Sequence, residues 1–300
     1  MNDFTQDTIH VGKGTFIGNG VTVFPLWTSG MEMTSVCFKT KHLTVTEVAG
    51  GPDVNRLSVT NNGHRDHVVV EGDIFEGGWQ NRVAACTMII PRGETVEVPV
   101  ACVEQGRWNG TQRHGRQVRR APYRTRSHLN ARLEVNPVTG LADASRVQSD
   151  VWMDIAAFEQ ARGVVPGHSL ALSMEQAEER HVADENSRQI SVLPGQRGVI
   201  VGIGGYIAAA EIFGSHEGLT QRFDAIVSAA RYEGLDAPNR ATPNFLARDF
   251  ATIIERNRVS TRRDVPEQIV TPVGPLAITS YALAAGLVHA AVFKLHNVNA

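Results

Sequence analysis

The sequence lacks the features that mark membrane-spanning, exported and disulfide-bonded chains. Its apolar runs fall short of the roughly 18–20 residues that a membrane-spanning helix needs. The first residues show neither the basic segment nor the apolar core of an export signal, so we expect none. The three cysteines, Cys37, Cys86 and Cys102, are odd in number and lack metal-ligand spacing. They indicate reduced thiols, and we therefore expect a cytoplasmic protein that binds no membrane.

The sequence also has little excess of charge of either sign. Over 300 residues the net charge is −2, and 42% of the residues are hydrophobic against 20% charged. This balance is typical of a globular chain and excludes a wholly disordered one. A surface devoted to DNA, RNA or anionic lipid needs a large positive excess, so the composition argues against a nucleic-acid partner.

Signatures of several common reaction classes are missing as well. No H-E-x-x-H, paired C-x-x-C, G-x-S-x-G or G-x-x-x-x-G-K-[ST] pattern occurs, which removes the usual support for zincin, zinc-ribbon, α/β-hydrolase and P-loop chemistry. His64 and His67 lie on a predicted turn without further ligands at metal spacing, so we predict no metal site and no cofactor. Gly202, Gly204 and Gly205 depart from the dinucleotide-binding fingerprint, and their context favours a hairpin turn.

Residues 17–107 consist of short β-branched runs separated by turn residues. The run at 21–26, the alternating run at 43–48 and the run at 83–90 are examples. The tripeptide Asn-Asn-Gly at 61–63 favours a tight hairpin. Strands at this spacing predict an N-terminal antiparallel β-sandwich, although an open barrel would give the same pattern.

The last half of the chain mixes helical and strand patterns. A helix is predicted to begin at Ser149 or Asp150, and further helices over 173–183, after Ser215 and from about Pro243. Three apolar strands close the chain. This order predicts an α+β protein, in which a C-terminal layer of helices packs on mostly antiparallel strands.

A segment rich in arginine joins the two halves. All of the 29 basic residues are arginines except Lys13, Lys39, Lys41 and Lys294, and no acidic residue occurs from Gln105 to Arg132. Guanidinium groups bind phosphates bidentately, so this segment could hold an anionic ligand; a solvated loop is the alternative. We predict a sandwich-like region at 1–108, a basic connecting loop at 109–148 and an α+β region at 149–300, which could also form one integrated domain.

Two segments between strands concentrate polar groups where packing would favour apolar ones. The segments are 71–82, which supplies Asp73, Gln80, Asn81 and Arg82, and 102–108, which supplies Cys102, Glu104, Arg107 and Trp108. Side chains at positions 102 and 104 share one face of a strand. If the two strands are neighbours, all of these side chains meet at one end of a sheet.

Each of these residue types has a chemistry that suits a ligand site. Asp73 and Glu104 are acid–base candidates, and Cys102 is a nucleophile if its thiol is exposed and its pKa is depressed. The predicted ligand contacts are anion binding by Arg82 and Arg107, amide recognition by Gln80 and Asn81, and stacking on Trp108. The alternative is a buried polar network that ties the ends of the strands together.

Segments spread over nearly the whole chain also match one family pattern in order. They are VTVFPL at 21–26, EGD at 71–73, QNR at 80–82, VPVACVEQGRW at 98–108, SDVW at 149–152, IFGS at 212–215 and GLVHAAVF at 286–293. Through them the chain resembles the ADP-ribosylglycohydrolase and rhodanese-phosphatase-superfamily-associated protein domain family. The resemblance implies a nucleotide ligand of the ADP-ribose type and supplies no established reaction.

We therefore expect this chain to bind or process an ADP-ribose-like or NAD-like nucleotide in NAD-linked metabolism. The alternative is a non-enzymatic, homo-oligomeric structural or accessory protein, and the sequence leaves open whether the chain is an enzyme. The apolar closing strands at 276–281 and 287–293 are too hydrophobic for a sheet that is exposed on one face, so either helices or a second subunit must cover them. We favour the second subunit and expect a symmetric homo-oligomer.

Overall fold

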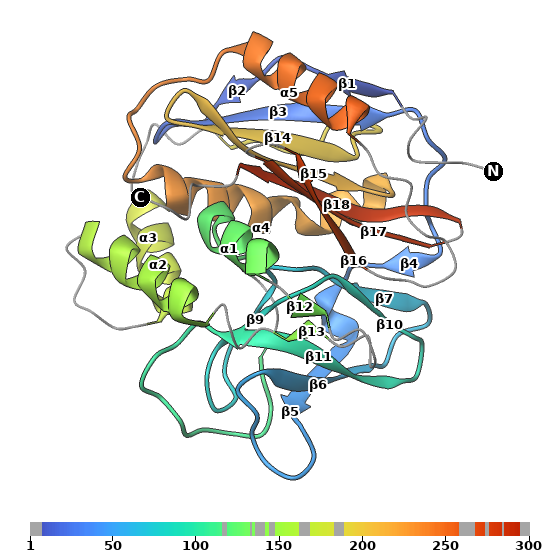
Figure 1. Ribbon diagram of the computed structural model, residues 1–300, viewed down its shortest axis with the longest axis vertical. Helices are drawn as coiled ribbons and strands as arrows, with labels where there is room; N and C mark the ends of the chain where they lie inside the picture. Colours follow the sequence, from blue (N-terminus) through green and yellow to red (C-terminus); the bar gives the residue numbers. More distant parts are fainter. Residues whose placement is uncertain are drawn as a thin grey trace. The chain divides into compact units, whose positions relative to one another are not determined.

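The structure is a computed structural model of the chain (Figure 1). It describes residues 8–115, 119–132, 134–135, 142–143, 148–161, 169–182, 189–257, 268–273, 276–283 and 285–294. The chain divides into two units: Met1–Thr34 with His181–Ala300, and Ser35–Arg180. This division differs from the predicted boundaries near 108 and 148, because the first strands pair with strands of the last third of the chain.

The first unit is built on one eight-stranded antiparallel sheet. Its order is β1 (Ile9–Val11), β3 (Val21–Thr28), β14 (Gly198–Ile203), β15 (Tyr206–Phe213), β18 (Gly286–Lys294), β17 (Leu276–Leu283) and β16 (Gln268–Val273), with β2 (Thr15–Phe16) paired to β3. β14 and β15 form the predicted hairpin, and Gly204 and Gly205 turn it with φ values of +61° and +92°. These are backbone conformations that glycine adopts without strain.

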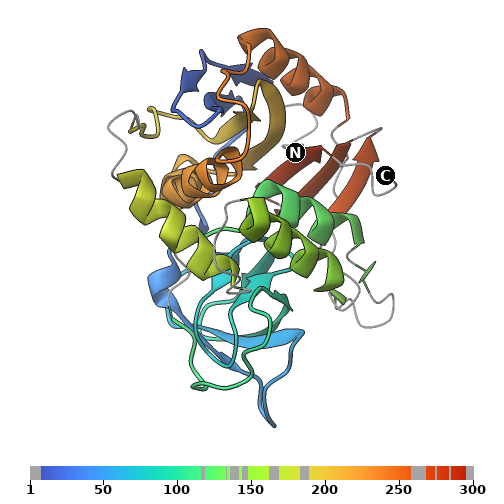
Figure 2. The ribbon, with the colours of Figure 1, turned by 90° about the vertical axis from the view of Figure 1, so that its left-hand side faces the viewer.

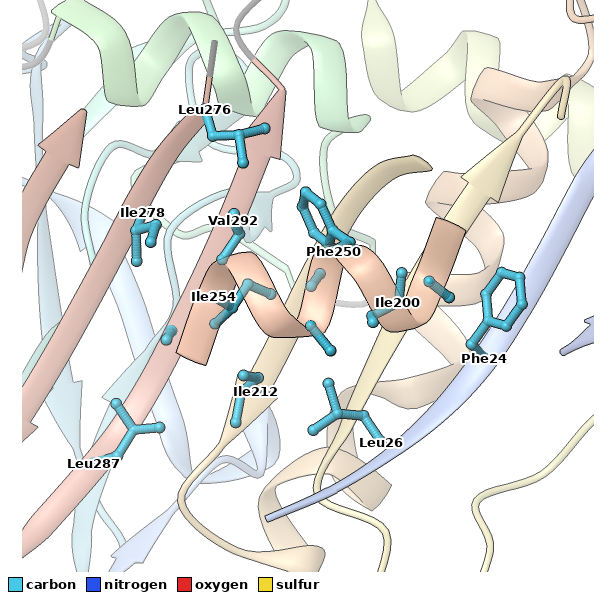
Figure 3. Packing of buried hydrophobic residues seen from close by; sticks show 14 residues of the cluster. Phe24, Leu26, Ile200, Ile212, Phe250, Ile254, Leu276, Ile278, Leu287 and Val292 are labelled. Atoms are coloured by element: carbon cyan, nitrogen blue, oxygen red, sulfur yellow. The ribbon is translucent and has the colours of Figure 1, made fainter. Parts of the chain in front are cut away.

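Two helices cover this sheet. α4 (His216–Gly234) begins where predicted, because the Ser215 hydroxyl accepts a hydrogen bond from the Gly218 N–H at 3.0 Å. α5 (Asn244–Arg256) packs Phe250 and Ile254 against the sheet (Figure 3). Residues 276–282 and 287–293 of the apolar closing strands are all buried within the chain itself, so these strands supply no ground for a second subunit, and the homo-oligomer remains a prediction.

The second unit holds two small sheets that enclose a common core. One sheet has the order β5 (Leu43–Glu47), β6 (Arg56–Asn61), β11 (Thr95–Cys102), β9 (Arg82–Ala84) and β8 (Ile74–Phe75); the other has the order β10 (Met88–Ile90), β7 (Asp66–Val69) and β4 (Val36–Cys37). Val59 and Val98 of the first sheet share a cluster with Val69 and Ile90 of the second. The α+β class with a strand-rich N-terminal part is confirmed.

Two local predictions in this unit are wrong in detail. The Asn61–Gly63 turn makes no hairpin, because β6 and β7 belong to different sheets. The Asn61 amide instead donates to the carbonyl of Ile90 at 2.9 Å, and so links the two sheets. The run predicted as one strand at 83–90 divides into β9 and β10, one in each sheet.

Short elements and three helices complete the second unit. They are the 3₁₀ helix η2 (Thr40–His42), the strand pair β12 (Glu134–Val135) and β13 (Ala142–Asp143), α1 (Tyr123–Arg132), α2 (Gln148–Ala161) and α3 (Leu170–Val182). α1 packs against α2 (Figure 2). In the part of the chain described here, no helix is both long enough and apolar enough to cross a membrane.

Residues 112–115 and 119–121 of the segment predicted as a connecting loop are hydrogen-bonded to strands and turns of this unit. His114 donates its backbone N–H to the carbonyl of Val45 at 2.9 Å, and the Ile74 N–H donates to the carbonyl of Arg119 at 3.0 Å. α1 follows within the same segment. Residues 116–118, 133, 136–141 and 144–147 of the predicted loop lie outside the described residues.

Arginines of this segment form ion pairs with acids far away in sequence. The excess of positive charge in the local sequence therefore does not show which of these arginines are already paired. The pairs are Arg119 with Glu76 and Glu178, Arg120 with Asp73, Arg124 with Asp154, and Arg126 with Glu71. Arg120, Arg126 and their partners are buried. Carboxylates of the protein itself therefore bind these guanidinium groups.

Candidate functional site

The two polar segments meet as predicted at the paired ends of β9 and β11. Cys102 lies opposite Arg82 in the antiparallel register. The Cys102 thiol contacts the Gln80 side-chain oxygen at 3.2 Å and the Glu104 carbonyl at 3.1 Å. The neighbouring Asn81 N–H donates to the Glu104 carboxylate at 2.9 Å. One strand end therefore gathers five of the predicted site residues.

The conditions set for Cys102 as a nucleophile are not met. Its side chain is fully buried, and burial raises the pKa of the thiol, although the Glu104 carbonyl and the Arg82 charge oppose that rise. The Gln148 side chain of α2 forms two hydrogen bonds of 2.7 Å with the Cys102 backbone: its oxygen accepts from the N–H, and its nitrogen donates to the carbonyl. Because nucleophilic attack requires an exposed thiolate, this geometry gives Cys102 a packing role.

Glu104 is held as a carboxylate by its surroundings. Burial raises its pKa, but two hydrogen bonds from Arg107, at 2.8 and 2.6 Å, and the Asn81 N–H bring that pKa below its usual value. A carboxylate whose two oxygens already accept charge-assisted hydrogen bonds has no proton to give at neutral pH. Glu104 is therefore poorly suited to general acid catalysis in this arrangement.

Arg107 uses every N–H of its guanidinium within the fold. Besides the two bonds to Glu104, Nη1 donates to the carbonyls of Gly78 and Asn109 at 2.8 and 2.9 Å, and Nη2 donates to the carbonyl of Gly77 at 3.2 Å. A guanidinium has no further donors. Arg107 thus ties the loop around residue 78 to the loop around residue 108, and it does not fit the predicted role of anion contact.

Arg82 presents the opposite situation. It has zero exposure, yet Nε, Nη1 and Nη2 have no hydrogen-bond partner among the described residues. The pKa of Arg82 is lowered because burial outweighs the opposing effect of nearby Cys102, Glu47 and Glu104. Its guanidinium carbon lies 5.5 Å from the ring centroid of Trp108. A buried guanidinium without acceptors is costly, so this is the position in the site that most needs a further explanation.

The Trp108 indole forms the solvent side of the site. It is 43% exposed, and its ring lies edge-on to that of Trp79, with the centroids 5.6 Å apart. One aromatic group therefore contacts solvent and the buried Arg82 charge at once. Indole rings take part in both cation–π contacts and stacking on planar ligands.

Glu47 and His114 belong to this neighbourhood and were missed by the sequence analysis. One oxygen of Glu47 accepts both the Trp79 N–H at 2.9 Å and the His114 Nε2 at 3.1 Å; within the described chain its other oxygen has no partner. Both side chains are fully buried, and burial lowers the pKa of His114 while Glu47 opposes this. A signal for Glu47 did exist, because it shares the inward phase of its strand with Val45.

Asp73 and Asn81 both form their hydrogen bonds within the protein. Asp73 forms a fully buried ion pair with Arg120 at 2.9 Å, and it also accepts the Val70 N–H at 3.1 Å. These bonds support a structural role in place of acid–base chemistry. The Asn81 amide accepts the Gly77 N–H at 2.7 Å and lies 3.4 Å from the Ser169 hydroxyl, so it is engaged within the protein.

No metal centre is evident in the parts of the chain that the structure covers: none of their His, Cys, Asp and Glu side chains gather in a group of three or more that could hold an ion.

Comparison with known proteins identifies the kind of chain that carries this site. Residues 8–293 match the family model of the ARG and Rhodanese-Phosphatase-superfamily-associated Protein domain. The match spans nearly the whole sequence, so the chain belongs to this family. The searches of curated proteins and of solved structures gave no match.

Proposed function

We propose that this protein binds an anionic nucleotide of the ADP-ribose or NAD type, with Arg82 as the anion contact and Trp108 as the stacking surface. The observation that carries the proposal is the buried guanidinium of Arg82, whose three nitrogens have no hydrogen-bond partner in the described part of the chain. A phosphate oxygen is the acceptor that suits such a group best. Arg107, by contrast, is already saturated.

Access to Arg82 runs past Trp108 in this proposal. The indole is partly exposed and contacts the guanidinium, so a ligand phosphate replaces the indole on Arg82 while a planar base stacks on the displaced ring. The nucleotide class is favoured because a nucleotide joins an anion to a planar base. Arg82 suits the anion, and the Trp108 ring suits the base. The family resemblance to proteins associated with ADP-ribose removal supports the same class.

Binding rather than turnover is the better-supported activity. Glu104 is engaged with Arg107, and Cys102 is buried with a raised pKa. Neither residue is set up for acid–base or nucleophilic chemistry in this arrangement. We accordingly propose a binding protein that acts in NAD-linked metabolism.

A thermal-shift experiment with three ligands tests this proposal. ADP-ribose and NAD should raise the melting temperature, and adenosine, which lacks a phosphate, should not. At a hundredfold excess over its dissociation constant a ligand adds about 2.7 kcal/mol to the unfolding free energy. Equal shifts with adenosine, or no shift with any of the three, would argue against an anionic nucleotide site.

The closed network around Arg107 favours a second candidate. Its bonds to Glu104, Gly77, Gly78 and Asn109 join two loops without involving a ligand. A non-enzymatic, homo-oligomeric structural protein would need such a network only for rigidity. Light scattering decides the oligomeric part of this candidate, because the monomer mass at micromolar concentration would contradict it.

A further inference from the structure

Glu47 has a carboxylate oxygen that is as unusual as the Arg82 guanidinium. Its Oε1 accepts two hydrogen bonds, from the Trp79 N–H and from His114 Nε2, whereas Oε2 is buried with no partner among the residues that the structure describes. Within the described chain, Oε2 is therefore a buried acceptor without a donor.

This acceptor belongs to the same neighbourhood as Arg82. The Trp79 backbone binds Glu47, the Trp79 ring packs edge-on against Trp108, and Trp108 covers Arg82. The charge on Glu47 favours the charged form of Arg82, so the two groups interact electrostatically. They nevertheless form no hydrogen bond with each other, since no described residue accepts from the Arg82 nitrogens.

We infer that Glu47 is a second ligand-binding residue, which accepts a hydrogen bond from a hydroxyl group of the molecule whose phosphate binds Arg82. This inference rests on the proposed function and narrows it. Among the described residues, Glu47 has an acceptor without a donor and the neighbouring Arg82 has donors without an acceptor, and this pair is complementary to a ligand that carries a hydroxyl group close to an anion. The class with that pattern is the sugar phosphates, among which ribose phosphate forms part of every ribonucleotide. His114 acts as a positioning residue that occupies Oε1.

The test compares two phosphates of similar charge by titration calorimetry. Ribose 5-phosphate carries hydroxyl groups, and butyl phosphate carries none. A hydrogen bond to a charged group is worth roughly a tenfold or greater difference in affinity, so the wild-type protein should prefer ribose 5-phosphate by at least about that factor. In Glu47→Gln, which keeps one oxygen for Trp79 and His114, this preference should fall to about threefold or less. Removal of the Glu47 charge should change the affinity for both phosphates by a similar factor, so the ratio of the two affinities is the readout.

A matched control and a second measurement keep the test decisive. Glu97→Gln removes a carboxylate from β11 that is paired with the exposed Arg56, and it should leave the preference unchanged. If Glu47→Gln does not fold, equal affinity of the wild-type protein for the two phosphates is enough to overturn the inference. An undiminished preference in folded Glu47→Gln also overturns it while leaving the proposed function intact. Absence of binding of either phosphate to the wild type overturns both.

Discussion

Replacing Arg82 with methionine removes a buried charge that has no hydrogen-bond partner in the described chain, and it keeps most of the side-chain volume. Arg126 supplies a matched comparison. It is equally buried and lies 5.4 Å from the Tyr123 ring, much as Arg82 lies 5.5 Å from Trp108. The difference is that Arg126 forms an ion pair with Glu71. Comparison of Arg82→Met with Arg126→Met therefore distinguishes an arginine that binds a ligand from one that stabilises the fold.

The expected magnitudes differ in size and in sign. The unmade hydrogen bonds of the Arg82 guanidinium cost about 1–3 kcal/mol, and its cation–π contact returns about 0.5–2 kcal/mol. The attraction of Glu47 and Glu104 offsets the burial of its charge. Arg82→Met should thus change the unfolding free energy by between a gain of about 2.5 and a loss of about 1 kcal/mol. Arg126→Met leaves Glu71 buried and unpaired, which costs about 3–5 kcal/mol. At roughly 2–4 °C per kcal/mol, Arg126→Met lowers the melting temperature by about 6–20 °C and Arg82→Met by about 4 °C at most.

The assay is thermal unfolding of both variants with and without ADP-ribose. Without ligand, Arg82→Met should melt near or above the wild-type temperature. With ligand it should show no shift, whereas Arg126→Met should keep the ligand-dependent shift above its own lower baseline. A loss of stability in Arg82→Met as large as that in Arg126→Met would refute the reasoning, because Arg82 would then be a structural residue.

Two further predictions follow from the polar groups of the second unit. Burial, reinforced by Glu71, raises the pKa of Cys86 to about 12. The thiol of the unfolded chain ionises from about pH 9, so the unfolding free energy falls as the pH rises above that value. In urea titrations at increasing pH, Cys86→Ala should show a shallower fall than the wild-type protein. An equally steep loss in the variant would contradict that assignment. Arg107→Ala should lower the unfolding free energy by about 1–3 kcal/mol by leaving Glu104 without its main partner. The affinity of the folded variant for ADP-ribose should stay unchanged, and a weakened affinity in fully folded protein would restore Arg107 as a ligand contact.

Much of the fold could be predicted because its signals are local. The hairpin at Gly204 and Gly205 needs positive φ values, and the helix after Ser215 needs an N-cap, so short stretches of sequence determine both. The division into units was not predictable in this way. It depends on the pairing of β3 with β14, strands that lie far apart in the sequence. Hydrophobic periodicity indicates that each is a strand and says nothing about its neighbour.

The convergence of the polar segments was predictable from the sequence, whereas the hydrogen-bond partners of the individual side chains were not. Strand alternation placed Cys102 and Glu104 on one face, and the structure brings Gln80, Asn81 and Arg82 to the same place. Whether an arginine has an acceptor among the described residues depends on the backbone carbonyls around it, and these are positioned only by the folded loops. The acid partners of the arginine-rich segment are likewise distant in sequence, as the 47-residue separation of Asp73 and Arg120 illustrates.

The central claim is that Arg82 binds the phosphate of a nucleotide, and a crystal structure of the protein with ADP-ribose tests it most directly. We predict a diphosphate oxygen within about 2.7–3.2 Å of an Arg82 guanidinium nitrogen, with the Trp108 indole displaced from its present contact. ADP-ribose bound elsewhere, with Arg82 still covered by Trp108 and lacking an acceptor, would contradict the account.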